Sequence, residues 1–315
     1  MWAGPGTMRS SKGGLVPGLC RCLGPGLLFL LLWAAMAPAQ GLPEDNVPGP
    51  DFSIQVRSRG QWVHEDVVFL RQDEPCPVFR AFPPNGPAPR WVLLEPVPGE
   101  YDLAEFKDSP RKPGQRLAIS YTMRALGARG PEFQFTEHRN PGSCGVYYLT
   151  LARFTDSLPD SGLGTPEPLH REFSPRVVQI VVRRDDSYTG LLSELFHTPF
   201  ILPPLRVRHG HQTDERVGSD CAEFAIYGRR RMGHAVPYVG PKGIYKYLAP
   251  VQGPPLPGDI LHFGEQVTVF WQDLGEPGII DGEDEVAESW PPGPQVKLFK
   301  ESEYYGRRFR VYRWK

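Results

Sequence analysis

The chain has 315 residues, with 35 Lys and Arg against 36 Asp and Glu, for a formal net charge of -1. This length allows two domains with cores of their own, and the balanced charge excludes the basic surface that nucleic-acid binding requires. The 34 glycines and 36 prolines follow no period, so they indicate many turns rather than a collagen-like fibre.

Residues 1–39 have the pattern of a secretory signal peptide. Three basic residues, Arg9, Lys12 and Arg21, precede a short apolar run at 24–39, which ends in a small-residue cleavage motif at Ala39. We expect cleavage after this motif and a mature chain that is secreted, periplasmic or bound in the cell envelope. The run is short for a spanning helix, so we expect no stable membrane span after its removal.

Cleavage would remove Cys20 and Cys22 and leave Cys76, Cys144 and Cys221. An odd number of cysteines in an oxidising compartment indicates one thiol without a disulfide partner. Cys76 and Cys144 both lie in the strand-rich first half of the chain. We therefore predict a disulfide between these two and a free thiol at Cys221.

Residues 40–51 form a polar, proline-rich linker. From 52 to 184, short runs rich in strand-forming residues alternate with turn signals, which is typical of an antiparallel, all-β sandwich. The expected strands are 52–58, 62–71, 76–82, 90–96, 116–124, 145–154 and 175–184. We find no catalytic constellation in this domain and interpret it as a binding or positioning module.

The pattern changes at 185–315 to helices first and antiparallel strands afterwards, which predicts an α+β domain. Ser187 is placed to cap a helix over 188–196. A second helix begins at Cys221, and a turn at 257–259 opens the strand region. The expected strands that follow are 260–263, 266–272, 296–299 and 307–314.

The helix that begins at Cys221 has the clearest boundary signals. Asp220 is a favourable N-cap, and Glu223 completes the spacing of a capping box. Three arginines at 229–231 occupy the last turn, where cations suit the helix dipole, and Gly233 fits the C′ position. Cys221 therefore occupies the first helical position.

A thiol at a helix N-terminus faces free backbone N–H groups, which favour its charged form. We therefore predict that Cys221 is a free nucleophile of low pKa. The alternative is a buried, inert structural cysteine.

The order of motifs in 205–290 resembles the NlpC-type, papain-like cysteine peptidases of bacterial cell walls. The shared motifs are Asp220-Cys221-Ala222 at a helix start, Val236-Pro237 soon after that helix, and Pro257-Gly258-Asp259-Ile260-Leu261 at the start of a strand. The resemblance implies a papain-like domain in which Cys221 attacks an amide bond of a peptide or peptidoglycan-like substrate, without a cofactor. Backbone N–H groups at the helix start would hold the oxyanion.

The resemblance places the catalytic histidine at the start of the next strand, where this chain has Gln266. Glutamine cannot accept and return a proton at neutral pH, so His262 on the preceding strand is the candidate base. Strand alternation puts His262 and Ile260 on one face and Leu261 and Phe263 on the other. We expect the cysteine helix to pack on the apolar Leu261 and Phe263 face, which would point His262 away from the thiol.

Five residues around the helix are assigned to substrate binding: Ser219, Asp220, His211, His234 and Tyr238. The spacing of His209 and His211, with Asp214 nearby, is weak evidence for zinc, and we favour a polar loop. The acidic turn at 281–285 lacks the ligand order of an EF-hand, so we interpret it as a solvated turn. We predict no metal site.

Two functions follow from these residues, and Gln266 separates them. The first is an exported cysteine hydrolase that acts on amide bonds through Cys221. The second is a catalytically inactive relative that binds peptide or glycan in the cell envelope. A third interpretation, a purely structural envelope protein, makes Cys221 a core residue. Whether the chain is an enzyme stays open at the level of sequence.

Overall fold

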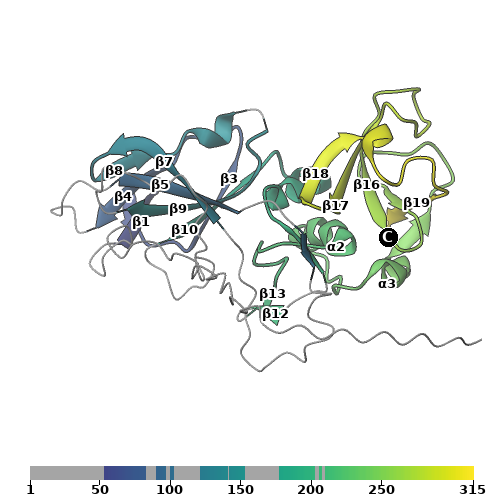
Figure 1. Cartoon of the computed structure of the whole chain (residues 1–315), viewed down its shortest axis with the longest axis horizontal. Helices are drawn as coiled ribbons and strands as arrows, with labels where there is room; N and C mark the ends of the chain where they lie inside the picture. The colour runs from purple at the N-terminus through teal and green to yellow at the C-terminus, as the bar shows by residue number, and fades with distance from the viewer. Residues whose placement is uncertain are drawn as a thin grey trace, which may run out of the picture. The chain divides into compact units, whose positions relative to one another are not determined.

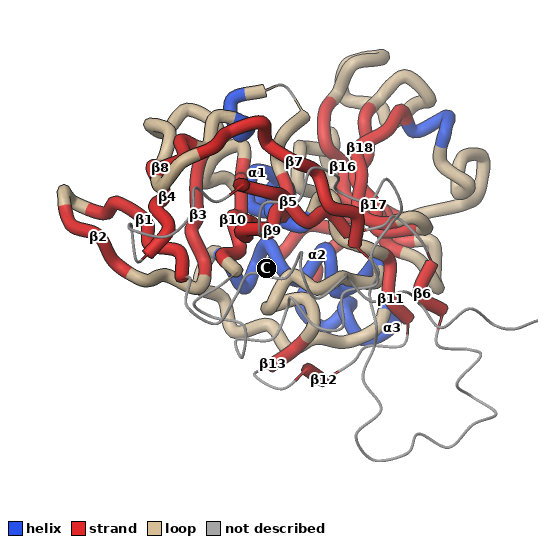
Figure 2. The backbone as a smooth tube through the Cα atoms, turned by 60° about the vertical axis from the view of Figure 1, so that its left-hand side comes forward, coloured by secondary structure: helices blue, strands red, loops and turns tan. Residues whose placement is uncertain are grey.

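A computed structural model describes residues 53–82, 90–96, 100–102, 121–140, 142–152, 177–202, 206–207 and 210–315. The predicted signal peptide and linker at 1–51 lie outside the described residues. Contacts group the described residues into one compact unit. The predicted boundary between two domains at residue 184 stays a prediction. Strands predominate over helices along the described chain (Figure 2).

Two sheets make up the first half (Figure 1). One has the order β2 (Gln61–Val63), β1 (Ser53–Ser58), β4 (Val78–Phe82) and β8 (Glu132–Gln134). The other has the order β3 (Val67–Arg71), β10 (Val178–Arg183), β9 (Gly145–Ala152), β5 (Arg90–Pro96) and β7 (Tyr121–Arg129). Both contribute to one hydrophobic core, with Ile54 and Phe79 from the first sheet and Trp91, Leu149 and Ile180 from the second. The prediction that this half is β-rich is confirmed.

One pairing in the second sheet departs from the antiparallel arrangement that we expected. Strand β10 pairs with β3 in parallel, while its other neighbour, β9, is antiparallel. Both faces of β10 are buried, so Gln179 lies among apolar neighbours and has to be hydrogen-bonded. Its amide donates to Tyr148 Oη at 3.1 Å and accepts from Arg216 Nε at 2.9 Å. The sheet is therefore covered on this face by the segment that leads to the cysteine helix.

The second half consists of short helices and a six-stranded antiparallel sheet. The helices are α1 (Tyr188–Leu192), η5 (Ser193–Leu195), α2 (Cys221–Arg231), α3 (Pro241–Ile244), η6 (Tyr245–Tyr247) and η7 (Phe299–Glu301). The sheet order is β14 (Leu248–Pro250), β19 (Arg310–Trp314), β15 (Ile260–His262), β16 (Val267–Gln272), β17 (Glu285–Trp290) and β18 (Gly293–Leu298). Smaller pairs join β6 (Glu100–Asp102) to β11 (Phe200–Leu202), and β12 (Arg206–Val207) to β13 (Gly210–His211). Within the described residues, no helix is long and apolar enough to cross a membrane.

Helix α2 packs on the face of this sheet that carries Ile260, Val269 and Ala287 (Figure 1). The opposite face carries Leu261 and Phe270, and it is covered by residues near the end of the chain, Phe299 and Phe309. Our expectation that α2 packs on Leu261 and Phe263 is therefore wrong. The apolar pair is buried by a segment distant in sequence, which leaves the face of Ile260 and His262 to the helix.

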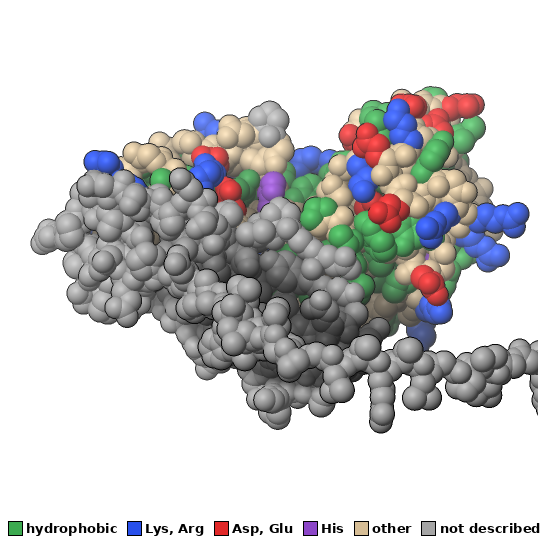
Figure 3. All heavy atoms as spheres, in the orientation of Figure 1, with side chains coloured by type: hydrophobic (Ala, Val, Ile, Leu, Met, Phe, Trp, Pro, Cys, Tyr) green, Lys and Arg blue, Asp and Glu red, His purple; other side chains and the backbone are tan. Residues whose placement is uncertain are grey.

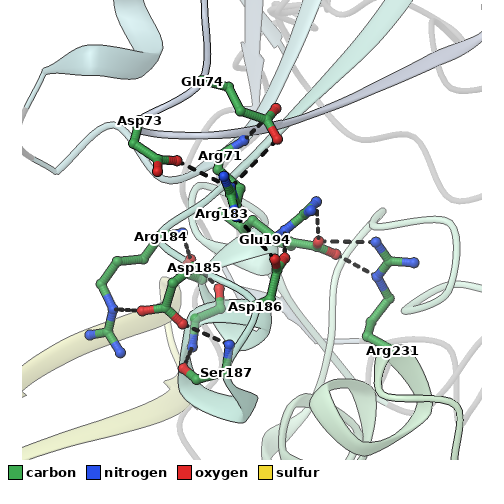
Figure 4. A network of polar contacts seen from close by, with 12 residues as sticks. Arg71, Asp73, Glu74, Arg183, Arg184, Asp185, Asp186, Ser187, Glu194 and Arg231 are labelled. Atoms are coloured by element: carbon green, nitrogen blue, oxygen red, sulfur yellow. Dashed lines mark hydrogen bonds and ion pairs between the residues drawn. The ribbon is translucent and has the colours of Figure 1, made fainter.

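The end of α2 is held by a buried carboxylate (Figure 4). Glu194 of η5 is fully buried and accepts hydrogen bonds from Arg231 Nε at 2.7 Å and from Arg231 Nη2 at 3.0 Å. Tyr227 Oη donates to the same carboxylate at 2.6 Å, and Arg183 Nη1 lies 3.7 Å from it. Because α1 and η5 follow β10 directly, this network fixes α2 against the neighbouring sheet.

Candidate functional site

Cys221 begins α2, as the sequence predicts, with Asp220 as the N-cap. The cysteine is only 6% exposed. Burial raises the pKa of its thiol, and the neighbouring Asp220 carboxylate raises it further; backbone N–H groups of Val267 and Ala222 oppose this with smaller effects. The free thiol is as predicted, but its pKa is raised where a lowered pKa was expected, and its role as a nucleophile stays a prediction. The helix dipole favours a thiolate only where solvation or a cation supports the charge, and this thiol has a carboxylate beside it instead.

The first turn of α2 carries a capping box between Asp220 and Glu223. Glu223 N donates to Asp220 Oδ1 at 2.8 Å, and Asp220 N donates to Glu223 Oε2 at 3.4 Å. Gln212 Nε2 and Thr213 Oγ1 donate to the same Glu223 oxygen at 2.9 and 2.8 Å. Burial and the adjacent Glu223 charge raise the pKa of Asp220 to about 7. This buried pair of carboxyl groups next to the thiol is the opposite of the electropositive surroundings that activate cysteine.

His211 and Tyr238, both assigned to substrate binding, lie together beside this first turn. Their rings stack with centroids 3.9 Å apart. His211 Nε2 lies 3.2 Å from Glu223 Oε1, outside hydrogen-bond geometry. Tyr238 Oη donates to Asp214 Oδ1 at 2.7 Å, and Arg230 forms two hydrogen bonds with the same carboxylate. Burial and the Asp214 charge raise the pKa of Tyr238. The imidazole is thus turned toward Glu223 and Tyr238.

His262, the candidate base, is buried on the α2 face of the sheet but uses both ring nitrogens elsewhere. Its Nδ1 accepts the backbone N–H of Gly264 at 2.9 Å and lies 2.8 Å from Tyr245 Oη. Since Nδ1 accepts, the proton sits on Nε2, which donates to the Pro241 carbonyl at 2.8 Å. The ring stacks on Tyr245 at 3.9 Å, and burial lowers the pKa of His262.

Gln266, at the position of the expected catalytic histidine, is 2% exposed. Alternation along β16 puts it on the side of Thr268 and Phe270, opposite to α2. Its Nε2 and the Thr268 hydroxyl have no hydrogen-bond partner among the described residues. On the same side, buried Glu288 accepts from Ser302 Oγ at 2.9 Å and contacts Lys297 Nζ at 2.7 Å. Gln266 therefore lies on the sheet face opposite to α2, the face that also carries Thr268 and Glu288.

The two remaining substrate-binding assignments do not converge on Cys221. Ser219 is buried, and its carbonyl accepts a hydrogen bond from Ser289 Oγ at 2.8 Å, which ties the chain before α2 to β17. His234 is exposed and follows the other end of α2. Eleven residues of helix separate the two ends by roughly 16 Å at ~1.5 Å per residue.

The three described cysteines, Cys76, Cys144 and Cys221, are all free. The predicted disulfide between Cys76 and Cys144 is therefore wrong. Cys76 is half-buried and lines a cavity beside β1, whereas Cys144 is buried and hydrogen-bonds to Ser193. Burial raises the pKa of Cys144. Their positions in strand-rich sequence gave no information on whether their side chains face each other.

The acidic turn is built by its own carboxylates. Asp284 is fully buried and accepts the backbone N–H groups of Leu274, Gly275 and Asp281. Asp281 in turn accepts from the backbone N–H of Glu276 at 2.9 Å. These carboxylates stabilise loop geometry, and within the described residues no group of three or more His, Cys, Asp or Glu side chains is placed to hold a metal ion.

Sequence reasoning missed the residues that decide the role of His262, namely Tyr245 and Pro241. They lie in a separate short helical segment, and no spacing signal links them to β15. It also missed Gln212 and Thr213 as partners of Glu223. Their proximity to the α2 N-terminus in sequence was the one signal that pointed to them.

Comparisons with known proteins identify no relative. No family model matches the chain, and neither a curated protein nor a solved structure matches it.

Proposed function

We propose that this chain is a non-catalytic binding protein of the cell envelope that holds peptide or glycan. In this proposal its second half is a papain-like relative that keeps the cysteine helix and has lost the hydrolytic machinery, and its first half is a β-sandwich module. Export rests on the predicted signal peptide at 1–39.

The observation that carries the proposal is the hydrogen bonding of His262. Thiol hydrolysis requires an imidazole that accepts the thiol proton and later returns it to the leaving group. In this protein Nε2 of His262 donates to Pro241 and Nδ1 accepts from Gly264. A ring fixed in this way supports a loop and has no nitrogen left for Cys221.

The state of Cys221 supports the same conclusion. The buried thiol has a raised pKa, and its nearest titratable neighbour is a carboxyl group whose own pKa is raised. A negative Asp220 opposes formation of a thiolate, whereas activated cysteines are paired with cations. His211, the other imidazole near α2, stacks on Tyr238 beside Glu223.

Peptidoglycan fragments provide the test, with hydrolysis and binding measured on the same samples. Wild type, Cys221→Ala and His262→Ala are incubated with muropeptides, and products are followed by mass spectrometry. We expect no hydrolysis by any of the three proteins, and retention of intact fragments by both wild type and Cys221→Ala. Hydrolysis that is lost in Cys221→Ala would show that the chain is a thiol hydrolase and would refute the proposal.

A further inference from the structure

A cavity of about 730 Å³ lies away from Cys221 and from every residue assigned to catalysis. Its walls come from β5, the middle of β7, the segment that carries Glu137, the start of β9, the segment after η5, and β18. The lining residues used below are Arg124, Glu137, Tyr147, His197, Gln295 and Val296. This volume falls in the range of small-ligand sites and accommodates a long side chain with its neighbouring backbone.

The polar wall of the cavity is an ion pair between Arg124 and Glu137 in which Glu137 can accept further hydrogen bonds. Arg124 Nη1 and Nη2 donate to the two oxygens of Glu137, each at 3.3 Å, and its Nε donates to Glu95 at 2.9 Å. Charge-assisted bonds are usually shorter than 3.3 Å, and each Glu137 oxygen has acceptor capacity beyond one such bond. Burial, followed by the charge of Glu95, raises the pKa of Tyr147 in the same wall. These contacts favour an occupant that brings a positive charge to Glu137.

The aromatic wall carries a strained residue. His197 has φ 66°, in the left-handed region that few residues other than glycine adopt, and its ring lies 5.7 Å from that of Tyr147. Strain of this kind persists where the fold requires a side chain in a particular place. A space-filling view shows a histidine side chain lying between charged side chains and a hydrophobic region (Figure 3). His197 is exposed, and it is one of the residues that line the cavity.

The third wall is an open sheet edge. Strand β18 is the last strand of the six-stranded sheet and pairs only with β17 among the described strands. Phe299 and Asp284 are the next opposite residues after the last pair of the β17–β18 ladder, and Phe299 N donates to Asp284 O at 2.7 Å. Residues 299 and 284 are therefore a hydrogen-bonded pair of this antiparallel ladder. Alternation in an antiparallel ladder then directs the backbone groups of Val296 away from β17. Pro294 has the same parity, as expected of a proline whose nitrogen faces the open edge.

We propose that an extended peptide adds to the open edge of β18 at Val296 and places a basic side chain in the cavity, against Glu137. Backbone pairing to a free sheet edge supplies sequence-independent affinity, and a pocket for one side chain supplies the selectivity. This inference rests on the proposed binding function and identifies its ligand as peptide rather than glycan. It places the site on side chains that the motif analysis did not include, and Cys221 is not among the residues that line it.

Pooled hexapeptides test the chemistry of the ligand. Three acetylated and amidated pools carry Lys, Glu or norleucine at the fourth position and random residues elsewhere, and a chito-oligosaccharide mixture serves as the glycan arm. Retention by the full mature chain is measured by size exclusion and mass spectrometry. We expect the Lys pool to be retained at least about ten-fold more than the Glu pool. Preferential retention of the oligosaccharides, or equal retention of all three pools, contradicts the proposal.

Variants locate the site, using the tightest peptide from the Lys pool and fluorescence anisotropy. Glu137→Gln removes the charge while keeping the shape, and we expect the affinity for the Lys peptide to fall by about ten-fold. Val296→Pro removes the outward N–H together with the valine side chain, and we expect binding to be lost. Val296→Ala removes the side chain alone, so it should keep clearly more affinity than Val296→Pro. Circular dichroism establishes that each variant is folded.

Backbone methylation of the peptide tests the same pairing with the wild-type protein, so the result does not depend on whether a variant folds. Two N-methylated peptides are made, one methylated at the odd-numbered residues and the other at the even-numbered residues. Alternate N–H groups of an extended peptide point to opposite sides, so only one of the two peptides loses the N–H groups that would pair with β18. We expect one of the two peptides to bind and the other to fail. Intact peptides that bind irrespective of Val296, Glu137 and methylation pattern overturn this site alone. Peptide cleavage that depends on Cys221 overturns the proposed function itself.

Discussion

The Nε2–H of His262 donates a hydrogen bond to the carbonyl oxygen of Pro241, with 2.8 Å between the two atoms. This bond joins strand β15 to the first residue of helix α3. With the Gly264 N–H on the other ring nitrogen and Tyr245 stacked on the ring, the imidazole acts as a buried crosslink between β15 and the segment that contains α3 and η6.

Replacement of this crosslink should destabilise the fold. His262→Ala removes the hydrogen bonds to the Pro241 carbonyl and the Gly264 N–H, each worth about 0.5 to 1.5 kcal/mol, together with the packing of a buried ring. We expect the free energy of unfolding to fall by about 2 to 4 kcal/mol in urea titrations. His234→Ala is the control, because that exposed histidine should change stability by less than about 0.5 kcal/mol. Equal stability of both variants would contradict the structural role.

The contribution of His262 to the free energy of unfolding should depend on pH in one direction. Burial lowers the pKa of His262 below the ordinary histidine value of 6.5, so the folded state favours the neutral ring. The contribution is therefore fully present above pH 6.5 and is lost as pH falls below it through the folded pKa. The stability difference between wild type and His262→Ala should shrink from pH 7 toward acid. A difference that grows on acidification would mean that the ring is charged in the fold.

Asp220 should behave in the opposite way. Its pKa is raised from 3.8 to about 7, so its contribution to stability is present below pH 3.8 and is lost as pH rises to about 7. Asparagine is an equally good N-cap and carries no charge. We expect Asp220→Asn to be more stable than wild type at pH 8 by about 1 to 3 kcal/mol, and similar at pH 4. Lower stability of the variant at pH 8 would show that the carboxylate is favourably paired.

The Glu194 network predicts strong coupling between two residues. Removing Arg231 leaves the buried Glu194 carboxylate with Arg183 as its nearest cation, at 3.7 Å. We expect Arg231→Ala to cost about 3 kcal/mol in chemical denaturation. Adding Glu194→Gln should recover part of this loss, since the unpaired charge is gone. Lys242→Ala, at a side chain that is 82% exposed, is the control. If the double variant loses as much stability as Arg231→Ala and Glu194→Gln lose together, the two side chains are not coupled and the network is contradicted.

Cysteine labelling tests the thiols directly. All three described cysteines are free, and Cys76 is the most accessible of them, since Cys144 and Cys221 are buried. Without reductant, the native protein should incorporate iodoacetamide first at Cys76, and at all three sites after unfolding. If the unfolded, non-reduced mature chain shows only one reactive thiol, two of its cysteines are joined in a disulfide, and the predicted pairing of Cys76 with Cys144 would have to be reconsidered.

Local signals in the sequence predicted local structure well. The capping box of Asp220 and Glu223 and the end of α2 near Gly233 are where the residue types place them. The helix at Ser187 has its predicted cap, which accepts from Gly190 N. These signals involve residues within one turn of each other, so a single sequence contains all the information that they need.

Long-range relationships were predicted poorly, and each failure has a physical cause. Alternation gave the two faces of β15 correctly, but Phe299 and Phe309, about forty to fifty residues later, decided which face α2 covers. The pKa of Cys221 was misjudged because the dipole was weighed without the burial and the Asp220 charge. The parallel pairing of β3 and β10 has no local signature at all. The cavity beside β18 joins residues from five separate segments, so sequence motifs could not indicate it.

The ionisation of Cys221 distinguishes a thiol hydrolase from a non-catalytic relative. A hydrolytic cysteine paired with an imidazole carries its negative charge at neutral pH, while a buried thiol beside a carboxyl group stays protonated. The measurement is the thiolate ultraviolet absorbance of the folded chain as a function of pH, taken as the difference between wild type and Cys221→Ser. The account predicts no thiolate signal from Cys221 below about pH 9. A thiolate signal that is already complete at pH 7 would contradict the non-catalytic role and would support a thiol hydrolase.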